Sequence, residues 1–83
     1  MNPILQQEYN NYFEMFRTSG WKQFIEDMQE ALDGYAIEDI KDGEHLALVK
    51  GERRMLKQVL QFQWAIEMNY ELLEEESVND QTL

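Results

Sequence analysis

Few side chains in this sequence have the chemistry that catalysis or metal binding requires. His45 is the single histidine among 83 residues, and there is no cysteine. A nucleophilic triad needs a nucleophile, a base and an orienting acid close together, and a zinc site needs several nitrogen or sulfur ligands. The spacing suggests neither arrangement, and the sequence has no glycine-rich phosphate loop. We therefore expect a non-enzyme with no metal and no cofactor, in which His45 is a partly exposed residue in the first turn of a helix.

The acidic residues suggest two metal-binding patterns, and both fail in detail. Residues 33–44, DGYAIEDIKDGE, begin with Asp and end with Glu, as a calcium loop does. Tyr35 and Ile37 occupy the third and fifth positions, where oxygen ligands are needed, and Glu38 occupies the position where the turn needs glycine. A di-metal centre in a helical bundle needs Glu-x-x-His motifs, and the sequence has none. A solvated acidic face is the better interpretation of these acids.

Charge is distributed unevenly along the chain. The formal net charge is −10, from 17 acidic and 7 basic residues, so a nucleic acid would be repelled and direct binding to one is not expected. Four bases lie close together at Lys50, Arg53, Arg54 and Lys57, and no base follows them. Acids near the end of a helix oppose its dipole. The acidic face that follows is either a solvated surface or one that meets a basic partner, and it consists of Glu67, Glu71, Glu74 and Glu75.

The spacing of apolar residues predicts three helices in one all-α domain, residues 1–76. Apolar residues recur every three or four positions over about 3–17, 20–33 and 44–76, as on one face of a helix. Residues 77–83 are expected to fray, as chain ends often do.

Capping residues mark the ends of these helices. Asn2, followed by proline, suits the start of the first helix, and Ser19 suits the start of the second. Gly34 is a natural stop for the second helix, and Asp42 with Gly43 marks the start of the third.

The third helix is too long for a compact domain of this size. Residues 44–76 would span about 50 Å, whereas a compact chain of 83 residues is only about 25 Å across. The first two helices laid end to end, about 46 Å, would form the other arm of an elongated antiparallel hairpin. Two helices side by side leave apolar surface open, so we expect oligomerisation to complete the fold. A kink or break at Gly51 is the alternative.

The aromatic content indicates where a partner would bind. Two tryptophans, four tyrosines and four phenylalanines are more than so small a core can hold, and exposed aromatic residues are typical interface anchors. The third helix also has an apolar face wider than a two-stranded coiled coil needs. The residues predicted to bind a partner protein are Trp21, Phe24, Met55, Val59, Phe62, Trp64, Ile66, Tyr70 and Leu73.

Neither a leader nor a membrane segment is expected. Residues 1–10, MNPILQQEYN, lack the basic start and the long apolar run of a signal peptide. No stretch approaches the roughly 20 apolar residues that a membrane helix needs. The chain is therefore expected to be soluble, to be made in a cytoplasm and to have no membrane partner.

Three segments resemble small acidic helical proteins encoded by tailed bacteriophages. They are SGWKQFIEDMQE at 19–30, KGERRMLKQVLQF at 50–62 and NYELLEEE at 69–76. Those proteins are mostly described as phage or virion-associated proteins of unknown function, and they have no catalytic residues to transfer to this chain. The resemblance implies a viral origin, a helical hairpin, and a location in the cytoplasm of an infected bacterial host or in the virion.

These observations favour a non-catalytic protein that works by binding protein. We expect it to self-associate as a homo-oligomer or to dock on a larger viral or host assembly. The alternative is an acidic inhibitor that mimics DNA and blocks a host nucleic-acid enzyme or defence system. Such a mimic would space its carboxylates like phosphates along one face, and the acidic face is the motivation for it.

Overall fold

The fold is all-helical, as the apolar spacing predicted. The computed structural model describes residues 1–35 and 40–82, and within them it contains four helices and no strand. The helices are α1 (Pro3–Phe16), α2 (Ser19–Asp33), α3 (Gly43–Leu60) and α4 (Phe62–Thr82). Ile37 and Glu38, which decided against a calcium loop, lie outside the described residues.

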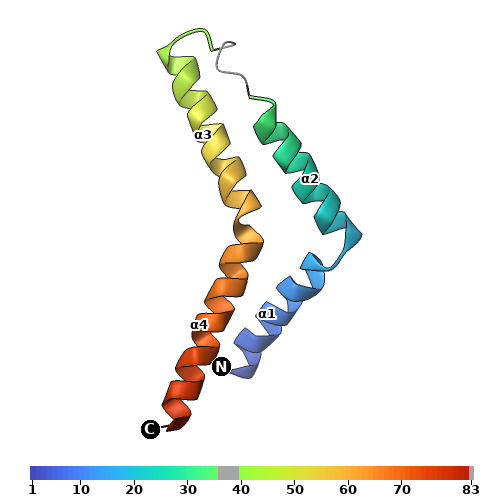
Figure 1. Ribbon diagram of the computed structural model, residues 1–83, viewed down its shortest axis with the longest axis vertical. Helices are drawn as coiled ribbons and strands as arrows, with labels where there is room; N and C mark the ends of the chain where they lie inside the picture. Colours follow the sequence, from blue (N-terminus) through green and yellow to red (C-terminus); the bar gives the residue numbers. More distant parts are fainter. Residues whose placement is uncertain (36–39, 83) are drawn as a thin grey trace.

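The four helices form two bent arms that lie side by side (Figure 1). The first arm is α1 followed by α2, and the second is α3 followed by α4; α2 packs on α3 and α1 packs on α4. The molecule measures 59 × 30 × 16 Å. A helix with its side chains is about 10–12 Å wide, so the shortest dimension leaves no room for a third layer over the two arms. Both arms therefore have a long uncovered side.

Side chains cap the starts of α1, α2 and α3. The Asn2 side chain accepts a hydrogen bond from the Leu5 amide at 2.7 Å, and the Asp42 side chain accepts one from the His45 amide at 2.7 Å. Both caps agree with the prediction from the sequence. The second helix is capped by Thr18, whose hydroxyl accepts from the Trp21 amide at 3.1 Å, and Ser19 is already the first helical residue. The predicted cap at Ser19 is wrong by one residue because Thr18 is the residue with extended backbone, with φ −76° and ψ 149°.

Replacing Thr18 with alanine should destabilise the chain through this cap. The Thr18 hydroxyl accepts from Trp21 and donates to the Met15 carbonyl at 2.7 Å, so it joins the end of α1 to the start of α2. Loss of an N-cap typically costs about 1 kcal/mol. Urea denaturation followed by circular dichroism should show this loss for Thr18→Ala. The exposed neighbour Ser19 provides the control, because Ser19→Ala leaves the cap in place; an equal loss in both variants would contradict the assignment.

The helix predicted over residues 44–76 is two helices in the structure. The break lies at Gln61, with φ −92° and ψ −2°, and Gly51 remains inside α3. A single glycine lowers helix propensity by only about 1 kcal/mol and does not by itself end a helix. The break has a tertiary cause instead. The ring of Phe62, the first residue of α4, packs against Phe16 at the end of α1 and Trp21 at the start of α2. Both arms bend at about the same level (Figure 1).

The tail predicted to fray from residue 77 continues the last helix. α4 extends to Thr82. The terminal amino group of Met1 donates a hydrogen bond to the Ser77 hydroxyl at 3.0 Å, which ties the start of the first arm to the last turns of the second.

Aromatic rings of α1, α2 and α4 pack against one another between the two arms. Phe16 is the single buried residue among those whose side chains are described, with 6% of its surface exposed. Its ring centroid lies 5.1 Å from that of Trp21 and 6.0 Å from that of Phe62. The Trp21 indole nitrogen donates to the Gln63 side chain at 2.9 Å, which satisfies its polar group across the two arms. We call the eight connected rings the aromatic cluster: Tyr9, Tyr12, Phe13, Phe16, Trp21, Phe24, Phe62 and Tyr70.

Candidate protein-binding site

Much of the large apolar surface of this molecule stays in contact with solvent. The exposed large apolar side chains range from Met1 and Met15, each 37% exposed, to Ile4, 77% exposed. They also include Met55 at 60% and Trp64 at 64%. Burial of apolar area stabilises by roughly 25 cal/mol per Å², so an uncovered surface of this kind favours association with another chain.

An apolar groove lies between α2 and α3. Its volume is about 380 Å³, and nearly all of its lining surface is apolar. The groove contains five of the nine residues predicted to bind a partner, together with the polar side chain of Gln58. These five residues, contributed by both arms, are Trp21, Phe24, Met55, Val59 and Phe62.

The other four predicted residues lie elsewhere. Tyr70 belongs to the aromatic cluster, with its ring centroid 5.0 Å from that of Phe13, and its hydroxyl accepts a hydrogen bond from Gln6 at 3.3 Å. Ile66 and Leu73 are half-buried on the same helix. Trp64 is exposed and contacts no other aromatic ring among the described residues. Tyr70 therefore helps to hold the two arms together, whereas Trp64 is free to contact a partner.

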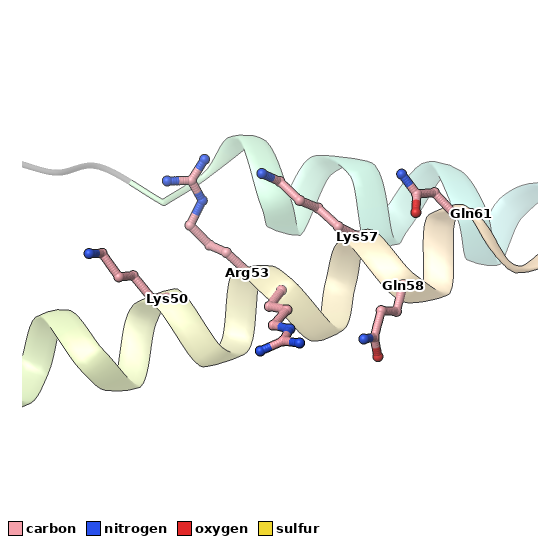
Figure 2. A pocket seen from close by; sticks show the side chains of 6 residues that line it. Lys50, Arg53, Lys57, Gln58 and Gln61 are labelled. Carbon is pink, nitrogen blue, oxygen red and sulfur yellow. The ribbon is translucent and has the colours of Figure 1, made fainter.

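A second groove is basic, and the list of partner-binding residues predicted from the sequence did not include it. It measures about 410 Å³ and is lined by residues of α3 and its cap alone: Lys50, Arg53, Arg54, Lys57, Gln58 and Gln61. Figure 2 shows these side chains projecting from α3, with α2 behind that helix. The bases recur at spacings of three and four residues, which places them on one side of a helix. That spacing is the signal that could have identified the groove.

One atom of the basic groove lacks a partner. The Nε atom of Arg53 is shielded from solvent and has no hydrogen-bond acceptor among the described residues. None of the residues that line the groove is acidic. Four bases and no acid line the groove, so this side of α3 is suited to receive carboxylates from another chain.

The acidic face predicted from the sequence is exposed. Glu67, Glu71, Glu74 and Glu75 all lie in α4 with solvent-accessible side chains. They follow the basic groove along the same arm. The second arm thus carries positive charge on its first half and negative charge on its second half.

The surroundings of His45 agree with a structural role. Its Nδ1 atom accepts a hydrogen bond from the Lys41 amide at 3.0 Å, next to the cap of α3. Among the described residues, no group of three or more histidine, cysteine, aspartate or glutamate side chains is placed to hold a metal ion.

None of the helices described is long and apolar enough to cross a membrane.

Tyr35 and Glu52 form a hydrogen bond between the end of α2 and α3. The phenol donates to the Glu52 carboxylate, which raises the pKa of Tyr35 because the bond and the nearby charge both favour the protonated phenol. The stabilisation from this bond is fully present below the ordinary tyrosine pKa of about 10 and is lost as pH rises through the raised value. Glu52→Gln should lower the Tyr35 pKa toward the ordinary value.

The measurement is an absorbance titration of the phenols. In the unchanged chain Tyr35 should ionise late, and Glu52→Gln should move its ionisation to lower pH. Glu44→Gln, an exposed change in the first turn of the same helix, is the control and should leave the titration unchanged. Identical curves for the chain and Glu52→Gln would contradict the hydrogen bond.

No protein-family model, curated protein or solved structure matches this chain.

Proposed function

We propose that this chain is a non-catalytic, phage-encoded protein that binds other protein chains. In this proposal it acts in the cytoplasm of an infected bacterial host or in the virion, either by self-association or by docking on a larger viral or host assembly. The three segments that resemble helical phage proteins are the reason for the viral assignment.

The observation that carries the proposal is how little of the chain is buried. Only Phe16 is buried among the described side chains, while Met55 and Trp64 remain about three-fifths exposed. Large apolar patches on a small protein commonly mark interaction sites. The apolar groove supplies a concave contact made of rigid rings, which lose little entropy on binding.

The test is affinity capture with a matched pair of variants. The tagged chain and the variants Met55→Glu and Ile4→Glu are each used to capture proteins from phage-infected cells. Both positions are exposed and apolar, but Met55 lines the apolar groove and Ile4 is on α1, outside it. Proteins held by the chain and by Ile4→Glu but lost with Met55→Glu would support the proposal. A chain that holds no protein and does not self-associate would contradict it.

A second candidate function is favoured by the exposed acidic face. Glu67, Glu71, Glu74 and Glu75 lie within about two turns of α4, and such a row of carboxylates suits a DNA mimic that inhibits a host nucleic-acid enzyme. A mimic should compete with DNA for that enzyme at low salt, and Glu71→Lys combined with Glu75→Lys should relieve the competition. Absence of competition at low salt would remove this candidate.

A further inference from the structure

The outer side of the second arm has a regular repeat of exposed residues, none of which lines the apolar groove. Eight exposed residues follow one another at alternating spacings of four and three, which is the spacing of a coiled-coil seam. The first half of the repeat lies in α3 and its cap: Lys50, Arg54, Lys57 and Gln61. The second half lies in α4: Trp64, Met68, Glu71 and Glu75. We call these eight residues the outer stripe.

The outer stripe is uncovered within one chain. The residues of its first half all line the basic groove, on the side of α3 with α2 behind it (Figure 2). In its second half, Trp64 is 64% exposed and Met68 is 37% exposed. The stripe is roughly 38 Å long at 1.5 Å per residue. A second helix over the stripe would cover Trp64 and Met68, and burial of their exposed apolar surface would favour the association.

The order of residues in the outer stripe selects an antiparallel partner of the same sequence. When two copies of the stripe lie antiparallel, the two bases at one end of each stripe face the two acids at the far end of the other. This match arises because these bases and acids lie equally far from the centre of the stripe. Reversal places Lys50 opposite Glu75 and Arg54 opposite Glu71 of a second copy. The inner layers then pair Lys57 with Met68 and Gln61 with Trp64. A parallel partner would place like charges opposite each other at both ends, which is unfavourable.

These charges cannot pair within one chain. Arg54 and Glu71 are on the same arm and are separated by roughly 26 Å at helical rise. In an antiparallel dimer each pair of opposite charges forms twice, once at each end of the interface. Lysine can also lay its apolar stem along a neighbouring side chain while its ammonium stays in water, so Lys57 is compatible with Met68.

The bend of the arm agrees with this pairing. α3 and α4 meet at Gln61 at a shallow angle that opens away from the first arm (Figure 1). Two such arms facing each other leave room near the middle, where the reversed pattern places two copies of Trp64. Tryptophan is the largest side chain and a common anchor at the centre of interfaces.

We propose that a second copy of this chain covers the outer stripe, so that the protein is an antiparallel homodimer with its two-fold axis between Gln61 and Trp64. The dimer rests on the proposed function, since it specifies self-association as the mode of protein binding and names the surface. The apolar groove between α2 and α3 remains open in the dimer and is available to a larger assembly.

A charge exchange tests the pairing in the intact chain. Light scattering at submillimolar concentration should give twice the 10.0 kDa mass of one chain. Arg54→Glu and Glu71→Arg should each lower the dimer affinity at least tenfold, and the double variant should restore it, because the exchanged charges again face each other. Both residues are exposed, so circular dichroism should show that all variants keep their helices. A single-chain mass, or no recovery in the double variant, would overturn the proposal.

Crosslinking tests the direction of the pairing. The chain has no cysteine, so one can be placed at will. Gln61→Cys should form a disulfide between copies because this position is close to the two-fold axis. Lys50→Cys should not, because the two copies of that position are roughly 38 Å apart in an antiparallel pair. Efficient crosslinking of Lys50→Cys would indicate a parallel dimer and overturn the proposal.

The two proposals fail in different ways. A single-chain mass together with capture of a partner that Met55→Glu loses would overturn the dimer and leave the proposed function standing. A single-chain mass with no captured protein would overturn both.

Discussion

Phe16→Ala should remove most of the stability of this chain. Phe16 is the single buried residue among the described side chains, and its ring lies against Tyr12, Trp21 and Phe62. Truncation of a buried phenylalanine typically costs about 3–5 kcal/mol. Chains of this length have roughly 4–12 kcal/mol of total stability, and a chain with so little buried area belongs near the lower end. The loss would therefore shift a large fraction of the molecules toward the unfolded state.

Urea denaturation at one fixed protein concentration measures the effect, since association would make the midpoint depend on concentration. Circular dichroism should report lower helix content for Phe16→Ala even without urea. Phe16→Leu is the matched control, because leucine keeps most of the apolar volume and should cost less than about 1.5 kcal/mol. A loss below about 1.5 kcal/mol for the alanine variant would mean that the joint between α1 and α2 is not the core.

Phe62→Ala should have the second largest effect. Phe62 is half-buried at the bend of the second arm, and its ring centroid lies 5.5 Å from that of Tyr12 and 6.3 Å from that of Trp21. Because the side chain is only partly covered, we expect a loss of about 2–3 kcal/mol, below the range for fully buried phenylalanine. The variant would also remove the contact that ties the bend of the second arm to the joint of the first.

Phe24 provides the comparison for Phe62. It lines the same apolar groove but is 43% exposed, so Phe24→Ala should cost less than about 1 kcal/mol. Phe16 and Phe62 are in contact, so their alanine variants should not be additive, and a double-mutant cycle should give a coupling of at least about 0.5 kcal/mol. Equal losses for Phe24→Ala and Phe62→Ala, or strict additivity, would contradict this account of the joint.

The residues of the second arm that hold the two arms together are largely different from those proposed to bind a partner; Phe62 belongs to both sets because it also lines the apolar groove. Tyr70 and Phe62 face the first arm through the aromatic cluster. Trp64 and Met55 are exposed. Changes at the first pair should be detected by denaturation of the chain, whereas changes at the second pair should alter association without loss of helix content.

Local patterns in the sequence were sufficient for the helices and for two of their caps. The recurrence of apolar residues every three or four positions predicted helical segments, since that spacing is a property of the helix itself. Asn2 and Asp42 were identifiable as caps because a cap bonds to an amide only three residues away. Thr18 was missed because Thr and Ser are adjacent and either side chain can cap; the backbone conformation decides between them.

The residues predicted to bind a partner were harder to separate into those that face the first arm and those that face solvent. Phe62, Ile66, Tyr70 and Leu73 are three or four positions apart and so share a face of α4. Trp64 lies two positions from both Phe62 and Ile66, about 200° around the helix, so the spacing already indicated a different face for it. The sequence did not show which of the two faces meets the first arm.

The tertiary structure alone decided the bend at Gln61 and the side of the second arm that stays open. Glutamine is an ordinary helix former, so nothing local marks position 61 as an end. The bend lies where the rings of Phe16 and Trp21 pack on Phe62, and Ser77 is held by the amino group of Met1. Each of these contacts joins residues more than forty positions apart. The sequence determines the helices because their hydrogen bonds are local, whereas the bend and the open face depend on which distant side chains pack together.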